Sequence, residues 1–182
     1  MKLHIIAALS LVFSSATAAP NPAPATFDVM ALRSASPIHF ARVEAARSAL
    51  FLGLPGQNAT CKGEHSDHAT FYVANEELFL YSCTGPKQKI FVDRSGMGQG
   101  VLGYMTGDQS LPRYGETKGW EVDTSSNLVF KGSGLLACPN SIDGAWKIWL
   151  NVGIAQPGGS KGCLGITART LENKKPVSCR YT

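Results

Sequence analysis

The chain has 182 residues and a formal net charge of +4, with 44% hydrophobic and 16% charged residues. Its lysines and arginines are scattered, which excludes the basic stripe by which proteins bind nucleic acid. No segment reaches the roughly 18 uninterrupted apolar residues of a membrane-spanning helix. The last residues, 176–182, are polar, so we expect no lipid-anchor signal there.

The first 19 residues predict a secretory signal peptide. Lys2 supplies a short basic region, the apolar run from Ile5 to Phe13 is too short to span a bilayer, and Ala16-Thr17-Ala18 fits the small-x-small cleavage pattern. Cleavage leaves about 163 residues, the size of one domain. We expect a proline-rich lead-in at residues 20–26 and one β-rich domain at residues 27–182.

The remaining sequence predicts an all-β, single antiparallel domain. Short β-branched and aromatic segments bounded by turn residues predict strands at 27–32, 70–74, 77–81, 89–92, 101–107, 120–122, 128–130, 135–138, 146–150 and 164–168. Segment 38–54 contains good helix formers, but its all-β surroundings favour a hairpin. A weak repeat of about 40–50 residues suits a β-trefoil-like barrel, and a β-sandwich fits the same strands.

A formal G-x-G-x-x-G match occurs at Gly98, Gly100 and Gly103. A dinucleotide-binding turn must leave a strand and open a helix. Here the strand at 89–92 is followed by an alternating segment, Val101 to Gly107, that two glycines interrupt. We therefore interpret Asp93 to Gly107 as a glycine turn between two strands, with no nucleotide cofactor.

Five cysteines, at positions 61, 83, 138, 163 and 179, predict disulfides in a secreted chain, with one thiol left over. Cys138 and Cys163 end short apolar runs on either side of a Gly/Pro-rich loop, which favours pairing between them. On the residues alone, Cys61 can then pair with either Cys83 or Cys179.

No residue pattern supports a catalytic centre, a cofactor or a metal site. Glu64, His65, Asp67 and His68 form a polar cluster without a second ligand pair at zinc-like spacing. There is no G-x-S-x-G elbow, and the acidic residues are too scattered to nominate a glycosidase pair.

Two other features bear on the surface of the protein. Asn58-Ala59-Thr60 is an N-glycosylation sequon in a loop of a secreted chain. Tyr104, Trp120, Trp146 and Trp149 are candidates for stacking on sugar rings, although packing in the core is the better expectation for each. Trp146 and Trp149 should point to opposite faces of their strand.

The sequence resembles the PhiA-type cell wall proteins of filamentous ascomycete fungi over nearly the whole mature chain. The matching segments are residues 30–36 (MALRSAS), 38–40 (IHF), 69–72 (ATFY), 77–81 (ELFLY), 93–100 (DRSGMGQG), 119–120 (GW), 134–139 (GLLACP), 141–146 (SIDGAW) and 162–165 (GCLG).

This resemblance implies a secreted, cell-wall-associated protein involved in forming phialides and conidia, in a family whose members are also described as IgE-binding allergens. It brings no catalytic residues. It also implies four paired cysteines, which favours Cys61–Cys179 with Cys83 free. We therefore expect a non-enzymatic wall glycoprotein that contacts wall polysaccharide. The alternatives are a lectin-like carbohydrate-binding protein and a small secreted hydrolase.

Overall fold

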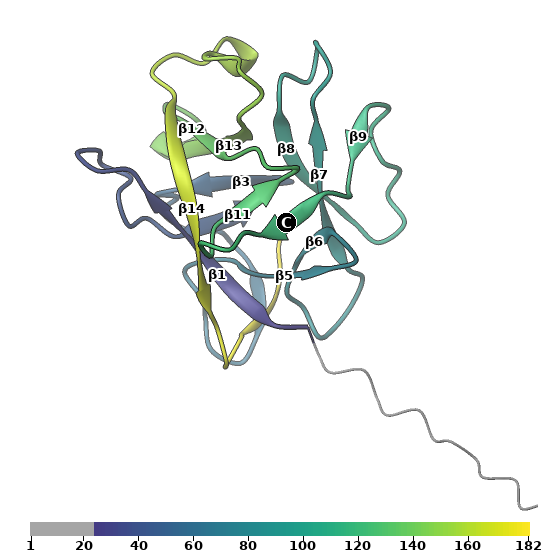
Figure 1. The fold of residues 1–182 in the computed structure, drawn as a ribbon. Coiled ribbons are helices and arrows are strands. Elements are labelled where there is room, and N and C mark those ends of the chain that lie inside the picture. Colours follow the sequence, from purple (N-terminus) through teal and green to yellow (C-terminus); the bar gives the residue numbers. More distant parts are fainter. Residues whose placement is uncertain (1–23) are drawn as a thin grey trace, which may run out of the picture.

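The computed structural model describes residues 24–182 (Figure 1). The predicted signal peptide and the first part of the lead-in lie outside these residues. The strands are β1 (Thr26–Leu32), β2 (Val43–Ala46), β3 (Ala49–Leu52), β4 (Thr60–Lys62), β5 (Thr70–Ala74), β6 (Glu77–Leu80), β7 (Gln88–Asp93), β8 (Val101–Thr106), β9 (Gly115–Glu116), β10 (Trp120–Val122), β11 (Leu128–Phe130), β12 (Leu135–Cys138), β13 (Trp146–Leu150), β14 (Leu164–Glu172) and β15 (Ser178–Arg180). Two short 3₁₀ turns, η1 (Ile142–Gly144) and η2 (Pro157–Gly159), complete the described elements.

Eight of these strands form a closed antiparallel barrel. The hydrogen-bonded order is β12-β14-β1-β5-β6-β7-β8-β13, and β13 also pairs with β12, which closes the ring. The β2–β3 hairpin extends the sheet from the edge of β13. The predicted all-β antiparallel domain is therefore confirmed, and its architecture is the barrel rather than the sandwich. Eight strands do not divide into three equal units, so the ring itself lacks the threefold repeat of a trefoil.

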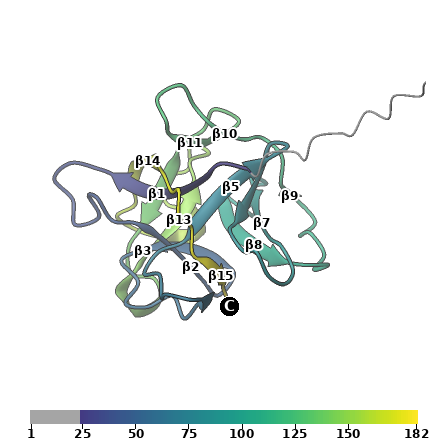
Figure 2. The same cartoon turned by 90° about the horizontal axis from the view of Figure 1, so that it is seen from below.

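The barrel interior is filled by apolar side chains that alternate along the strands, as in Val29 and Ala31 of β1 and in Ile148 and Leu150 of β13. Figure 2 shows the β10–β11 hairpin and the C-terminus on opposite sides of the barrel. Trp120 of the hairpin joins the core from one side and Tyr181 from the other. Trp120 is 1% exposed and Tyr181 is 2% exposed.

The C-terminal residues are held by a buried glutamine. The side-chain amide of Gln88 donates to the Tyr181 carbonyl oxygen at 2.7 Å, and its oxygen accepts from the Tyr181 amide at 2.9 Å. The carbonyl oxygen of Thr182 accepts from the Arg47 amide at 2.6 Å. The chain end is therefore part of the packed structure.

The ambiguous segment 38–54 forms the β2–β3 hairpin, which confirms the hairpin interpretation. Its two-residue turn, Arg47-Ser48, has φ values of 48° and 56°. Positive φ at both central positions matches the right-handed twist of the flanking strands. The turn at Asn75-Glu76 has the same conformation, with φ values of 51° and 62°.

The glycine-rich stretch Asp93 to Gly107 is a turn between antiparallel strands, as the sequence predicts. Asp93 pairs with Val101, and no helix follows the glycines. Gly100 has φ +90°, and a Cβ there would lie 2.3 Å from the Leu150 carbonyl oxygen. A side chain at that position would therefore separate β13 from the turn.

Two disulfides join distant parts of the chain, and they are the pairs that the resemblance favours. Cys61–Cys179 links β4 to β15 across 118 residues, and Cys138–Cys163 spans 25 residues. Cys83 is exposed and free. In the chain-entropy model, loops of these lengths contribute about 5 and about 3.5 kcal/mol of stability.

Thr26, expected in the lead-in, is the first residue of β1, where it pairs with Tyr72 of β5. Among residues 24–182, no helix has the length and apolar character needed to cross a membrane.

Candidate functional site: a buried aspartate on the barrel wall

Asp28 is a carboxylate in the middle of an otherwise apolar strand. Its neighbours Phe27 and Val29 point into the core, so strand alternation places Asp28 on the outer face of the barrel wall. It is nevertheless only 6% exposed. A buried carboxylate requires hydrogen-bond donors in place of the water that it has lost.

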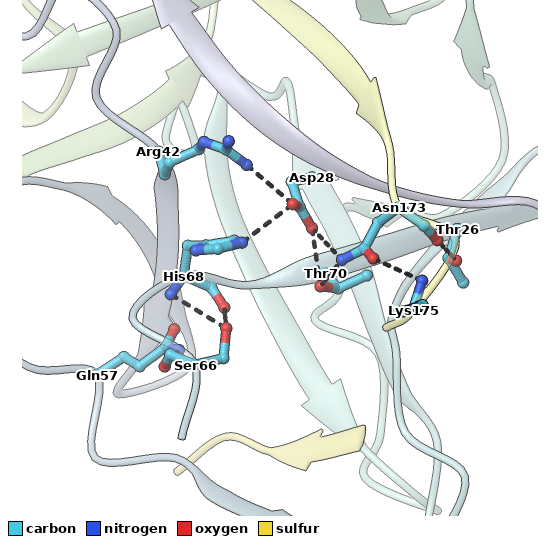
Figure 3. Close-up of polar contacts among 9 residues, drawn as sticks. All are labelled: Thr26, Asp28, Arg42, Gln57, Ser66, His68, Thr70, Asn173 and Lys175. Atoms are coloured by element: carbon cyan, nitrogen blue, oxygen red, sulfur yellow. Dashed lines mark hydrogen bonds and ion pairs between the residues drawn. The ribbon is translucent and has the colours of Figure 1, made fainter. Parts of the chain in front are cut away.

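Four side chains supply those donors (Figure 3). One carboxylate oxygen of Asp28, Oδ2, accepts from Arg42 Nη1 at 2.9 Å and from His68 Nε2 at 3.0 Å. The other, Oδ1, accepts from Thr70 Oγ1 at 2.8 Å and from Asn173 Nδ2 at 3.0 Å. The donors come from the segments before β2 and β5, from β5 itself and from the residue after β14.

These contacts set the ionisation of Asp28. Burial, the largest single influence, would raise its pKa. The hydrogen bonds from His68, Asn173 and Thr70 and the charge of His68 act in the opposite direction and together outweigh burial, so the pKa lies below its usual value. Asp28 is therefore a stable anion at the centre of the cluster.

A second layer of hydrogen bonds holds the loop that carries His68. Gln57 is 1% exposed; its amide donates to the Ser66 carbonyl oxygen at 2.7 Å and its oxygen accepts from the Ala45 amide at 3.3 Å. The Ser66 hydroxyl donates to the His68 carbonyl oxygen at 2.7 Å. The loop is thereby tied to the β2–β3 hairpin, and the imidazole is oriented toward Asp28.

A pocket of about 630 Å³ lies over this cluster and includes Lys174 and Lys175 in its lining. A histidine oriented by an aspartate is one part of a nucleophile–base–orienter arrangement. The nearby hydroxyl of Ser66, however, bonds to the main chain of His68 and not to its ring. The geometry thus matches a polar tie between strands better than a catalytic triad.

Glu44 of β2 is a second buried carboxylate in the same region, 8% exposed. Its Oε2 accepts from the Leu54 amide at 3.4 Å. Burial raises the pKa of Glu44 to about 7, although hydrogen bonds from the backbone of Leu54 and Gly53 and the charge of His68 act against that rise. Glu44 therefore titrates near neutral pH, in a position enclosed by the β2–β3 hairpin.

Comparison with known proteins identifies the family. A family model described as PhiA-like secreted protein matches residues 27–182. The chain belongs to that family. It is 49% identical to the cell wall protein phiA of Emericella nidulans, over the whole length of both chains. It is 44% identical to that of Aspergillus fumigatus, covering 100% of this chain and 98% of the relative, and 46% identical to that of Aspergillus niger, covering 95% and 97%. No solved structure matches.

Membership of the PhiA-like family confirms the resemblance seen in the sequence and places the protein outside the cell, in the cell wall. The relatives are named for that location and not for a reaction.

The four aromatic residues considered for sugar stacking do not form a binding platform. Tyr104, Trp120 and Trp149 are 3%, 1% and 8% exposed, and Trp146 is half-buried against the main core. Trp149 lies outside the barrel wall, where Gly158 of the disulfide loop covers its ring. Their large apolar rings pack against other residues, which is the expectation that the sequence favoured over sugar stacking.

The side chains of the polar cluster after Cys61 point in different directions in the structure. His68 faces Asp28, whereas His65 pairs with Asp67 at 3.2 Å on the surface. Within residues 24–182, no group of three or more histidine, cysteine, aspartate or glutamate side chains is arranged to hold a metal ion. Asn58 is exposed and has φ 49°, in the loop before β4, so its sequon is accessible.

Sequence reasoning missed Asp28, Arg42, Thr70 and Asn173. These residues are separated by up to 145 positions and meet only because β1 pairs with both β5 and β14. The available indication was a single aspartate within an apolar strand, since such a residue must find partners when the strand is buried.

Proposed function

We propose that the protein is a non-enzymatic glycoprotein of the cell wall that acts in the formation of phialides and conidia. Membership of the PhiA-like family supports this role, because the relatives are named as wall proteins. The exposed sequon at Asn58 supports the glycan.

The hydrogen bonding of Asp28 is the main support for a non-enzymatic protein. Each carboxylate oxygen accepts two hydrogen bonds, so its acceptor capacity is used within the fold. Asp28 does orient a base, His68, but the nearby hydroxyl of Ser66 bonds to the main chain of His68 and not to its ring, so Ser66 is not placed as the nucleophile that such a pair would activate. The hydrolase alternative therefore has less support. The lectin-like alternative loses the support of sugar-stacking aromatic residues, because Tyr104, Trp120 and Trp149 are buried.

The developmental role is tested by deleting the gene in the source fungus. We expect malformed phialides and fewer conidia, restored by the full-length gene. A copy lacking residues 2–19 is the matched control, because it encodes the same domain without the predicted signal peptide. Normal phialides and conidia in the deletion strain would overturn the developmental role.

The non-enzymatic assignment is tested with His68→Gln, which keeps an amide donor facing Asp28. A strain carrying this variant should form conidia as the wild type does, provided that the secreted protein retains its melting temperature. Purified wild-type protein should release no soluble sugar from chitin or β-glucan. Loss of conidiation with a folded, secreted variant, or sugar release abolished by that variant, would contradict the assignment.

A further inference from the structure

An open groove of about 550 Å³ lies beside the pocket over the Asp28 cluster, and Glu172 lines both. Its apolar lining includes the half-buried Val73 and the exposed Val122, and three exposed glutamates, Glu76, Glu121 and Glu172, lie on its rim. The walls are the β10–β11 hairpin, the ends of β1 and β14, and the turn between β5 and β6. We refer to this feature as the acidic groove.

The walls of the acidic groove are fixed by main-chain hydrogen bonds. The Glu76 carbonyl oxygen accepts from the amides of Gly119 and Trp120, both at 3.0 Å, which ties the β5–β6 turn to the hairpin. On the other side, the Ser126 carbonyl oxygen accepts from the amide and the hydroxyl of Thr170, at 2.9 and 3.0 Å. The groove is therefore formed before any ligand arrives, which lowers the cost of binding.

The charges around the acidic groove are of one sign. The three glutamates are exposed, and among the described residues no lysine or arginine lines the groove. Among residues 24–182, the cation that contacts one of these glutamates is Lys174, 3.7 Å from Glu172, and both of those side chains are more than two-thirds exposed. A pair of that kind is weak. In the described part of the chain, Glu76 and Glu121 form no ion pair.

Glu76 occupies a backbone position that favours glycine. It is the second central residue of a two-residue hairpin turn and has φ 62°. Glycine is preferred there because it has no Cβ to clash in the left-handed region. A glutamate at this site places a carboxylate on the rim at some cost in stability.

Trp120 forms part of the wall of the acidic groove. It is 1% exposed and its ring packs edge-on against Phe130, with the ring centroids 5.1 Å apart. This packing holds the β10–β11 hairpin against the core and so fixes the position of Glu121 beside it.

We propose that the acidic groove binds a cationic amino sugar chain of the cell wall, with the ammonium groups at the three glutamates. Opposite charge selects ammonium groups over neutral or anionic sugars, and the groups on the rim are far enough from the core to remain solvated. The apolar lining formed by Val73 and Val122 accepts the carbon-bearing face of a sugar ring. The proposal uses the wall location of the protein and not its developmental role, so the failure of either one leaves the other standing.

The probe is a fully deacetylated glucosamine hexamer, titrated by calorimetry into the intact secreted protein at pH 6 and low salt. Ordinary carboxylates are ionised and primary amines protonated at that pH. We expect binding that weakens at least tenfold when the salt concentration is raised to about 0.5 M. Replacing all three glutamates (E76Q, E121Q and E172Q together) should weaken it about tenfold, as expected for three exposed charge pairs. The matched control, Glu64→Gln, removes an exposed carboxylate outside the groove and should leave the dissociation constant unchanged.

A second variant, Glu76→Gly, separates binding from folding. It should weaken binding two- to threefold. It should also raise the melting temperature by about 2–4 °C, because the turn position favours glycine. Equal affinity of the triple variant and the wild type would overturn the proposal. So would equal affinity for the acetylated hexamer or a neutral β-glucan hexamer, which carry no ammonium groups. Tighter binding of a lysine hexapeptide would show a groove for basic peptides instead of sugars.

Discussion

Replacing the buried glutamate on β2 tests whether its burial controls the pH dependence of stability. Glu44 is 8% exposed and its pKa is raised from 4.5 to about 7, chiefly by burial. At 1.36 kcal/mol per pKa unit, this difference corresponds to about 3 kcal/mol of unfolding free energy. Because the folded pKa is raised, this contribution is fully present below pH 4.5 and is lost as the pH rises through 7.

The variant Glu44→Gln keeps a neutral acceptor for the Leu54 amide at every pH. It should resemble the wild type in stability near pH 4.5 and exceed it by up to about 3 kcal/mol at pH 8. Guanidinium unfolding curves at half-unit pH intervals between 4.5 and 8 measure this difference. Asp28, whose pKa is shifted in the opposite direction, is common to both proteins and cancels in the comparison.

The exposed variant Glu64→Gln is the control for a general effect of removing one negative charge, and its stability difference should stay flat over the same range. A difference between Glu44→Gln and the wild type that does not change between pH 5 and 8 would refute the reasoning. So would a difference that shrinks as the pH rises.

The other predictions concern the strand ties and the surface. Asp28→Asn should lower the unfolding free energy by about 2–4 kcal/mol at pH 7, because four donors lose an anionic partner. This loss of stability should vanish as the pH falls below the usual aspartate pKa of 3.8. The control, Asp108→Asn, replaces an exposed aspartate and should change the unfolding free energy little at any pH. Replacing Cys61 and Cys179 together by serine should cost about 5 kcal/mol in thermal or guanidinium unfolding, and an unchanged midpoint would contradict this. The secreted protein should lose one glycan on endoglycosidase treatment, and Asn58→Gln should already migrate at the position of the treated form.

Local sequence patterns predicted most strands because each strand carries its own alternation. The hairpin at residues 38–54 remained ambiguous because its turn, Arg47-Ser48, lacks the asparagine or glycine that usually marks positive φ. The pairing of β12 with both β13 and β14 closes the barrel, yet no local pattern encodes it. The Asp28 cluster was unpredictable for the same reason, since its members converge only through long-range strand pairing.

The closure of the barrel also determines when the protein can fold. β1, at the start of the domain, pairs along six residues with β14, which ends at Glu172, and the Cys61–Cys179 bond lies closer still to the C-terminus. Pairing between segments so distant in sequence is slow, because the loop must close before the contact is gained. During synthesis the N-terminal half therefore waits, with an unpaired strand edge, until the last residues have entered the secretory compartment. The edge of β1 that β14 later covers is therefore the part of the nascent domain most open to pairing with another chain.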